Sequence, residues 1–256
     1  MNYSTMKHRY FIQLAYKGTN YHGWQIQPNA ATIQETLEKA LSTILKEKIE
    51  TVGAGRTDTG VHTRFFMAHF ECLKEQLDQD KKIIVSLNGI LPLDISVQKI
   101  LPVSQDSHAR FSAISRTYEY HIHQQKDPFL EEYSYYLSSR LDMDKMNKAA
   151  ELIQRYTDFT SFSKLHTDVQ TNDCKIIQAG WKKEDHRLIF TIKADRFLRG
   201  MVRAIVGTML KLGFDKICLA EFCKIIEDKD RSKAGFSVPA HGLSLVDIEY
   251  REGLIK

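Results

Sequence analysis

The sequence predicts an α+β protein of two halves, each with the element order β-α-β-β-α-β, with mostly antiparallel sheets and helices packed on them. Stretches in which apolar and polar residues alternate indicate strands, and stretches with apolar residues three and four positions apart indicate helices. These stretches follow one another in nearly the same order twice along the 256 residues. That order is typical of the ferredoxin-like topology.

The first half begins with a strand over residues 8–17, where side chains alternate between two faces. A helix over 32–45 follows, because its apolar residues form one stripe and Thr32 with Glu35 is a capping-box pattern. The remaining elements are a strand, a glycine-rich loop, a strand, a helix and a strand, at residues 49–53, 53–60, 64–71, 80–88 and 95–101.

The second half repeats this order with one additional helix. Its strands are expected at residues 115–123, 174–181, 187–194 and 242–250. Its helices are expected at residues 142–153, 197–213 and 219–228. Gly213 stands where a glycine commonly ends a helix. No repeat is visible at the level of single residues, so the duplication rests on element order alone.

A polar connection at 103–112 separates the halves. We therefore expect an N-terminal α+β domain over residues 1–106, which carries the glycine-rich loop. A C-terminal α+β domain over residues 107–256 would carry the tyrosine and arginine segments described below.

Composition excludes several classes of protein. Apolar residues make up 43 % of the chain, with 13 glycines and 5 prolines, which excludes collagen-like, low-complexity and disordered chains. A net charge of +4 permits a polyanionic partner without requiring one. No 18 consecutive residues are apolar and no secretory signal is visible, so we expect a soluble, cytoplasmic protein with no membrane contact.

The four cysteines, Cys72, Cys174, Cys218 and Cys223, form no C-x-x-C pair. A zinc site would need paired close spacings, and a disulfide framework would need a shorter chain richer in cysteine. Reduced thiols in a cytosol are the simpler interpretation.

The segment from Gly53 to His62, GAGRTDTGVH, concentrates functional groups on a glycine-rich loop between two strands. It lacks the G-K-[ST] of a phosphate-binding loop and the G-x-G-x-x-G spacing. Arg56 and Asp58 could form an ordinary surface salt bridge in a tight turn. The alternative is a catalytic loop, because catalysis is concentrated on loops held by a rigid scaffold.

Two further segments carry chemistry. In SRTYEY, strand alternation places Arg116, Tyr118 and Tyr120 on one face, where tyrosines are often ordinary packing residues. Arg196, Arg199 and Arg203 are spaced three and four apart, so a helix would align them as a charged surface or a phosphate-binding row. The histidines are scattered, and no metal site is expected.

These segments resemble the motifs of one family. GAGRTDTGVHT resembles the G-R-T-D-A-G-V-H-A signature of the TruA family of tRNA pseudouridine synthases, and SRTYEY and FLRGMVRAIVG resemble its second and third motifs. FIQLAYKGTNYHGWQIQP and VPAHGLSLVDIEY also resemble family segments. The likeness runs from about residue 8 to residue 250. Thr59 and Thr63 stand where alanine is commoner, which affects loop packing.

The resemblance implies an RNA-uridine isomerase that converts uridine to pseudouridine at positions 38–40 of the tRNA anticodon stem-loop. The base is detached at N1 and reattached through C5, with no metal and no cofactor. Asp58 is the implied catalytic aspartate. Whether it acts as a nucleophile on the sugar or base, or as a base that removes a sugar proton and so gives a glycal, stays open.

The resemblance also implies roles for other residues. Arg203 and Arg56 would be the electrostatic partners that keep Asp58 ionised. Tyr118 would lie against the flipped base in a cleft between the halves, and Leu243 would form an apolar floor beneath it. Arg196 and Arg199 would contact tRNA. The family is dimeric, so we expect a homodimer in which one tRNA touches both subunits.

Two other classes remain as alternatives. An RNA-binding module without catalysis could present aromatic residues on a sheet face, but the chain lacks the usual aromatic run of such modules. A hydrolase or phosphoryl-transfer enzyme could use Asp58 as a nucleophile, but it would normally need a metal and further carboxylates. Incubation of the pure protein with unmodified tRNA in EDTA separates all three, because only the synthase forms pseudouridine there.

Overall fold

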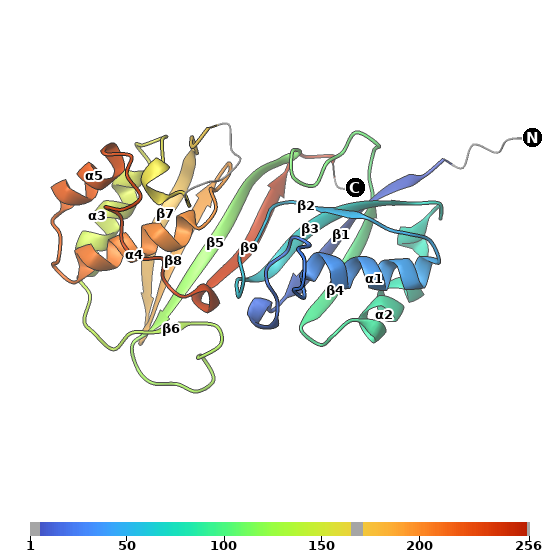
Figure 1. Cartoon of the computed structure of the whole chain (residues 1–256), viewed down its shortest axis with the longest axis horizontal. Helices are drawn as coiled ribbons and strands as arrows, with labels where there is room; N and C mark the ends of the chain where they lie inside the picture. The colour runs from blue at the N-terminus through green and yellow to red at the C-terminus, as the bar shows by residue number, and fades with distance from the viewer. Residues whose placement is uncertain (1–5, 165–170, 255–256) are drawn as a thin grey trace, which may run out of the picture. The chain divides into compact units, whose positions relative to one another are not determined.

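The computed structural model describes residues 6–164 and 171–254 (Figure 1). The chain divides into two compact units, the first holding Met1–Ile114 and Val246–Lys256 and the second Ser115–Leu245. These bounds differ from the expected boundary after residue 106, because the connection stays with the first unit. Ala109 of this connection is buried in the first unit. The Ala109 backbone N–H donates to Nδ1 of His69 over 3.1 Å, and the Ala109 carbonyl oxygen accepts from the Tyr250 hydroxyl over 2.6 Å.

The first unit has the predicted order of strands and helices. Its elements are β1 (His8–Tyr16), α1 (Ile33–Leu45), β2 (Thr51–Gly53), β3 (His62–Cys72), α2 (Lys81–Ile90) and β4 (Ile95–Pro102). The strands β4, β1 and β3 lie side by side in that order, β2 pairs with β3, and all these pairings are antiparallel. Short 3-10 turns at Gly18–Asn20 and Leu77–Gln79 join them.

Helix α1 begins where the sequence predicts. The Thr32 side chain accepts a hydrogen bond from the Glu35 backbone N–H over 3.3 Å, which satisfies one of the free donors of the first turn. The apolar stripe faces the core, because Ile33, Leu37 and Leu41 are fully buried. Burial of such side chains, and not helix propensity, supplies most of the stability of a helix of this length.

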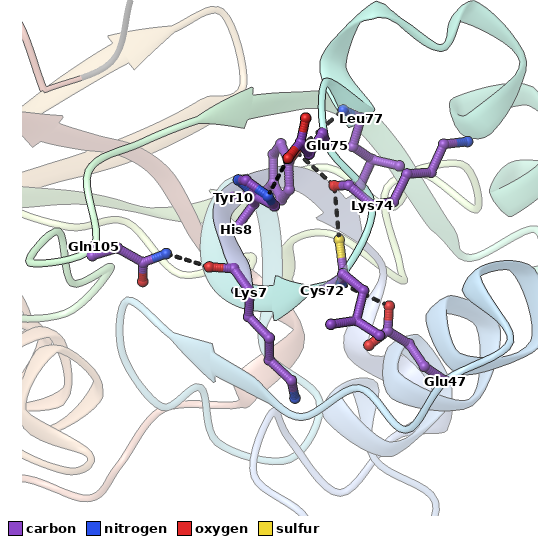
Figure 2. Close-up of polar contacts among 10 residues, drawn as sticks. Lys7, His8, Tyr10, Glu47, Cys72, Lys74, Glu75, Leu77 and Gln105 are labelled. Carbon is purple, nitrogen blue, oxygen red and sulfur yellow. Dashed lines mark hydrogen bonds and ion pairs between the residues drawn. The ribbon is translucent and has the colours of Figure 1, made fainter. Parts of the chain in front are cut away.

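A tyrosine on β1 holds the turn that follows β3 (Figure 2). The Tyr10 hydroxyl donates to the Lys74 carbonyl oxygen over 2.9 Å and accepts from the Leu77 backbone N–H over 3.2 Å. The Cys72 thiol donates to the same carbonyl oxygen over 3.6 Å. The ring of Tyr10 is buried, so one side chain of β1 satisfies backbone groups of a chain segment more than 60 residues away.

The second unit contains one strand that the sequence did not indicate. Its elements are β5 (Ala113–His123), β6 (Tyr135–Tyr136), α3 (Met143–Ile153), β7 (Ile176–Glu184), β8 (Arg187–Ala194), α4 (Met201–Gly213), α5 (Leu219–Glu227) and the start of β9 (Leu243–Tyr250). β5, β8 and β7 lie side by side and antiparallel, whereas the two-residue β6 pairs with β5 in parallel. The α+β class and the predominance of antiparallel strands are confirmed.

The prediction that a helix begins at residue 197 is wrong, because α4 begins at Met201. Gly200 precedes it with a φ of +71°, a left-handed conformation that favours glycine. Gly213 is the last residue of the helix, not the residue beyond its end. A Cβ there would lie 2.6 Å from the Met146 sulfur, so Gly213 is needed for close helix packing.

Within residues 6–164 and 171–254, no helix is both long enough and apolar enough to cross a membrane.

Candidate active site

The glycine-rich loop lies between β2 and β3, in the first unit. At its start, the Ala54 backbone N–H donates to the Met67 carbonyl oxygen over 2.8 Å. At its end, Gly60 has a φ of +78°, and the Val61 N–H donates to the Asp58 carbonyl oxygen over 3.1 Å. The loop is therefore closed on both sides by backbone hydrogen bonds, with Asp58 half-buried in its final turn.

The residue before Asp58 is the anchor of this loop. Thr57 is buried, and its Oγ1 lies 2.8 Å from the buried hydroxyl of Tyr16 at the end of β1. Its carbonyl oxygen accepts from the Trp24 N–H over 3.3 Å. Gly23 has a φ of +84°, and a Cβ there would lie 2.3 Å from that oxygen. Side-chain and backbone contacts thus hold Thr57, and they fix where the next residue begins.

A second contact holds the far end of the loop. The Gly18 backbone N–H donates to Nδ1 of His62 over 3.0 Å, and a Cβ on Gly18 would lie 2.1 Å from the Val61 carbonyl oxygen. His62 is buried, so its imidazole is a structural acceptor.

The hydrogen bond of the Arg56 side chain goes to a residue other than Asp58, and its electrostatic effect on Asp58 stays a prediction. Arg56 is exposed, and within the described chain its hydrogen-bond partner is Gln25, whose Oε1 accepts from Nε over 3.2 Å. Residues two apart in a turn need not face each other, and the exposed Gln25 amide lies within reach of the guanidinium. The side chain of Arg56 is thus held at the surface of the loop.

Tyr118 lies in the second unit, on β5. It is half-buried, and its ring meets Phe197 edge to face, with centroids 5.1 Å apart and planes at 86°. An edge-to-face pair of this kind restrains the plane of the Tyr118 ring. Phe197 immediately follows Arg196 in the segment that leads into α4.

Arg203 is positioned by backbone groups. Its Nε donates to the Val238 carbonyl oxygen over 2.7 Å, and the Val238 N–H donates to the Arg203 carbonyl oxygen over 3.3 Å. The chain can approach α4 this closely because Gly207 has no side chain: a Cβ there would lie 1.9 Å from the Phe236 carbonyl oxygen. The guanidinium is therefore oriented by a reciprocal contact with the chain segment at Val238, which packs against α4.

The predicted arginine row is corrected by the start of α4. Arg203 lies in the helix, whereas Arg196 and Arg199 lie in the preceding segment and do not share a helical face with it. The Arg196 backbone N–H donates to the Asp195 carboxylate over 2.7 Å, and the Arg199 carbonyl oxygen accepts from the Lys164 N–H over 3.1 Å. Gly200 in the left-handed conformation separates this segment from the helix.

Leu243 is buried at the first position of β9. Before it, Gly242 lies against the ring of Tyr120, where a Cβ would be 2.7 Å from Cζ. The Tyr120 hydroxyl donates to the Pro239 carbonyl oxygen over 2.9 Å, and burial raises the pKa of Tyr120 above its ordinary value. Tyr120 thus stays protonated, and its contacts with Pro239 and Gly242 support the segment that leads to Leu243.

Sequence reasoning missed the residues that position the site. Tyr16, Gly23, Gly207 and Tyr120 contact chain segments between 29 and 119 residues away, and no local pattern reports such pairs. One signal was present: a glycine at position 207, in the middle of an apolar helix, costs stability unless another chain segment packs on it.

Within the residues that the structure describes, no group of three or more His, Cys, Asp and Glu side chains could hold a metal ion. The four cysteines are free thiols, with Cys72 and Cys174 buried.

Comparison with known proteins gives one consistent result. The family model described as "tRNA pseudouridine synthase" matches residues 13–112 and 154–251. The chain is 55 % identical over 249 residues to "tRNA pseudouridine synthase A" of Bacteroides fragilis, covering 97 % of this chain and 98 % of the relative.

More distant relatives agree. A relative of the same name from Parabacteroides distasonis is 52 % identical, covering 96 % of this chain and 97 % of the relative. One from Acetivibrio thermocellus is 37 % identical, covering 93 % and 97 %. Since the match extends over nearly the whole of each chain and includes the loop around Asp58, this chain belongs to the family of tRNA pseudouridine synthases.

Proposed function

We propose that this chain isomerises uridine to pseudouridine in tRNA, at positions 38–40 of the anticodon stem-loop. The observation that carries the proposal is the placement of Asp58: it lies half-buried directly after Thr57, which Tyr16 and Trp24 hold in place. A carboxylate on a rigid loop, in a chain of this family, suits a reaction that depends on exact positioning.

The reaction is an isomerisation, so the product contains the same atoms as the substrate. It requires a carboxylate on the enzyme. The bond between N1 of uracil and C1′ of ribose breaks, the base turns, and a new bond forms between C5 and C1′. The proton that leaves C5 is balanced by one gained at N1. Asp58 would either form a transient bond to the sugar or base, or remove a sugar proton. In each case the ionised carboxylate is the active form.

The second unit would supply the surroundings of the base. Tyr118, oriented by Phe197, would stack on the flipped uracil and offer its hydroxyl for proton transfer. Arg203, oriented by Val238, would favour the ionised form of Asp58. Leu243 would pack beneath the base as an apolar floor. These assignments complete the site that the family motifs imply.

Three exposed or half-buried cations would bind the RNA backbone. Arg56 carries its charge at the surface of the catalytic loop, and Arg196 and Arg199 lie in the segment before α4. Arginine suits phosphate because its planar guanidinium can donate two parallel hydrogen bonds. Since the three residues come from two loops, each would contact its own phosphate.

The assembly proposed is a homodimer that acts in the cytoplasm without metal or cofactor. The four free thiols suit a reducing compartment. One tRNA would touch both subunits, as the family implies.

The test is to incubate the pure protein with an unmodified tRNA pool in EDTA and to map pseudouridine at single-nucleotide resolution. We expect pseudouridine at positions 38–40, at a rate within about a factor of two of that without chelator, provided the tRNA stays folded. Binding without pseudouridine would favour an RNA-binding module. A requirement for added zinc or magnesium that acts on the protein would contradict the proposed chemistry.

A further inference from the structure

A polar pocket lies in the second unit, at the end of β5 opposite to its first residues. It has a volume of about 570 Å³ and is lined by Gln124, Gln125, Ser138, Arg140, Lys183, Asp185 and His186. Three segments build it: the chain after β5, the chain after β6, and the end of β7 with the turn that leads to β8. None of these residues belongs to the family motifs quoted above.

Two cations of this pocket lack partners, although charges beside them are paired. Within the described residues, neither Arg140 nor Lys183 has an ion-pair partner, whereas the adjacent Lys182 lies 2.8 Å from the Glu184 carboxylate. Arg187 also faces Glu184, over 3.8 Å. Glu184 therefore pairs with the neighbouring cations, whereas Arg140 and Lys183 form no ion pair among the described residues.

The pocket is built on fixed backbone. The Gln124 N–H donates to the His186 carbonyl oxygen over 2.8 Å, and its Nε2 donates to the Ser139 carbonyl oxygen over 3.0 Å. These bonds tie the chain after β5 to the hairpin turn on one side and to the chain after β6 on the other. Arg140 is thus held through the hydrogen bond at the adjacent Ser139, and Lys183 is held by the pairing of β7 with β8.

The lining can recognise a phosphate group. Arg140 offers a planar guanidinium, Lys183 a compact ammonium, and Ser138 and Gln125 neutral hydrogen-bond donors. Asp185 is the one carboxylate on the wall and opposes an anion; it occupies the hairpin turn with a φ of +52°. Phe129, on the loop that begins at the pocket, is 88 % exposed and presents a ring on which a base could stack.

We propose that this pocket is a second RNA-binding site, which holds backbone phosphate of the tRNA away from the uridine that reacts. Six residues of extended chain separate Gln124 from Tyr118, a span of about 20 Å. Because the phosphate backbone runs continuously along a stem, a contact at that distance meets a different part of the same molecule. The inference rests on the proposed function, since it assumes tRNA as the substrate.

The test measures binding of one unmodified tRNA as a function of salt. Each phosphate contact contributes roughly 0.7–0.9 to the slope of log affinity against log salt. We expect the double variant Arg140→Gln with Lys183→Gln to lower that slope by about 1.5 and to weaken binding roughly tenfold or more at 0.1 M salt. Asp185→Asn should tighten binding, because it removes the opposing charge.

Lys182→Gln is the matched control. It removes the same charge one residue away, from a lysine that is already paired, and should leave the slope unchanged. If the double variant binds with the wild-type slope, the pocket does not contact RNA, and the proposal is overturned whether or not pseudouridine forms. If instead the wild-type protein binds tRNA through this pocket but forms no pseudouridine, the proposed function fails and the binding site stands.

Discussion

The hydroxyl of Tyr16 lies 2.8 Å from Oγ1 of Thr57, and both groups are buried. Tyr16 is the last residue of β1, and Thr57 directly precedes Asp58. The contact therefore links the paired strands of the first unit to the loop that carries the carboxylate. A side chain on a strand is a more precise support than a flexible loop, and positioning errors of about 1 Å are costly in catalysis.

Tyr16→Phe should lower both stability and turnover. The variant leaves the Thr57 hydroxyl buried without this partner, which we expect to reduce the free energy of unfolding by about 1–3 kcal/mol. Turnover should fall because Asp58 is held less precisely. Urea unfolding and single-turnover pseudouridine formation measure the two effects. Tyr136→Phe is the control, since its ring is 46 % exposed; equal effects from both variants would contradict a special role for Tyr16.

Gly23→Ala should disturb the same loop from its other side. Gly23 has a φ of +84°, and an added Cβ would lie 2.3 Å from the Thr57 carbonyl oxygen. Backbone strain and the clash together should reduce the free energy of unfolding by about 2 kcal/mol or more. Thermal and urea unfolding would measure the loss.

Gly89→Ala is the matched control for Gly23. It lies in helix α2, and an added Cβ there would meet nothing within 4 Å. Alanine there should be neutral or stabilising, because glycine costs about 1 kcal/mol in a helix. If the Gly23→Ala protein were as stable as Gly89→Ala, the Thr57 backbone could move away from the added Cβ without loss of stability, and the prediction would be contradicted.

The elements that sequence predicted well are those whose determinants are local. Thr32 caps α1 as its pattern indicates, and the apolar stripe from Ile33 to Leu41 is buried. The predicted start of α4 was wrong, because the helical spacing of Arg196, Arg199 and Arg203 continues through Gly200. The left-handed conformation of Gly200 is visible only in the structure. Periodicity cannot show where a chain leaves a helix.

The candidate site divides in the same way. A glycine-rich loop with Asp58 was visible as a motif, but the contacts of Tyr16 and Val238 that hold Asp58 and Arg203 join residues 41 and 35 positions apart. The hydrogen bond of Arg56 to Gln25 joins residues 31 positions apart, and closeness in sequence does not predict such a partner. Long-range contacts of this kind need the folded chain.

The protein should become less stable as the pH is lowered, because His69 takes up a proton more readily in the unfolded chain. Burial, His108 and Arg9 lower the pKa of His69 from 6.5 to about 4, and its Nδ1 accepts from the Ala109 N–H. The folded state thus keeps His69 neutral. The unfolded chain binds the proton more readily, so the stabilisation is present above about pH 6.5 and is lost as the pH falls toward 4, by roughly 3 kcal/mol.

His69→Asn separates this effect from other titrations. Asparagine keeps an acceptor for the Ala109 N–H but does not titrate, so the loss of stability between about pH 6.5 and 4 should become smaller. Unfolding free energies measured across that range would show it. His22→Asn, at an exposed histidine, should leave the pH profile unchanged. A wild-type profile in His69→Asn would mean that another group causes the acid sensitivity.

Asp58→Asn should separate chemistry from folding. The substitution keeps the size of the side chain, so the variant should fold. Because it removes the charge that Arg203 would face, we expect the free energy of unfolding to fall by about a few kcal/mol. The variant should still bind tRNA, yet form no detectable pseudouridine, because an amide can neither attack the sugar or base nor take a proton. Asp195→Asn is the control: its Oδ1 accepts from the Lys175 and Arg196 N–H groups, and asparagine retains that acceptor. Turnover by Asp58→Asn at even a tenth of the wild-type rate would exclude Asp58 as the essential carboxylate and direct attention to Tyr118.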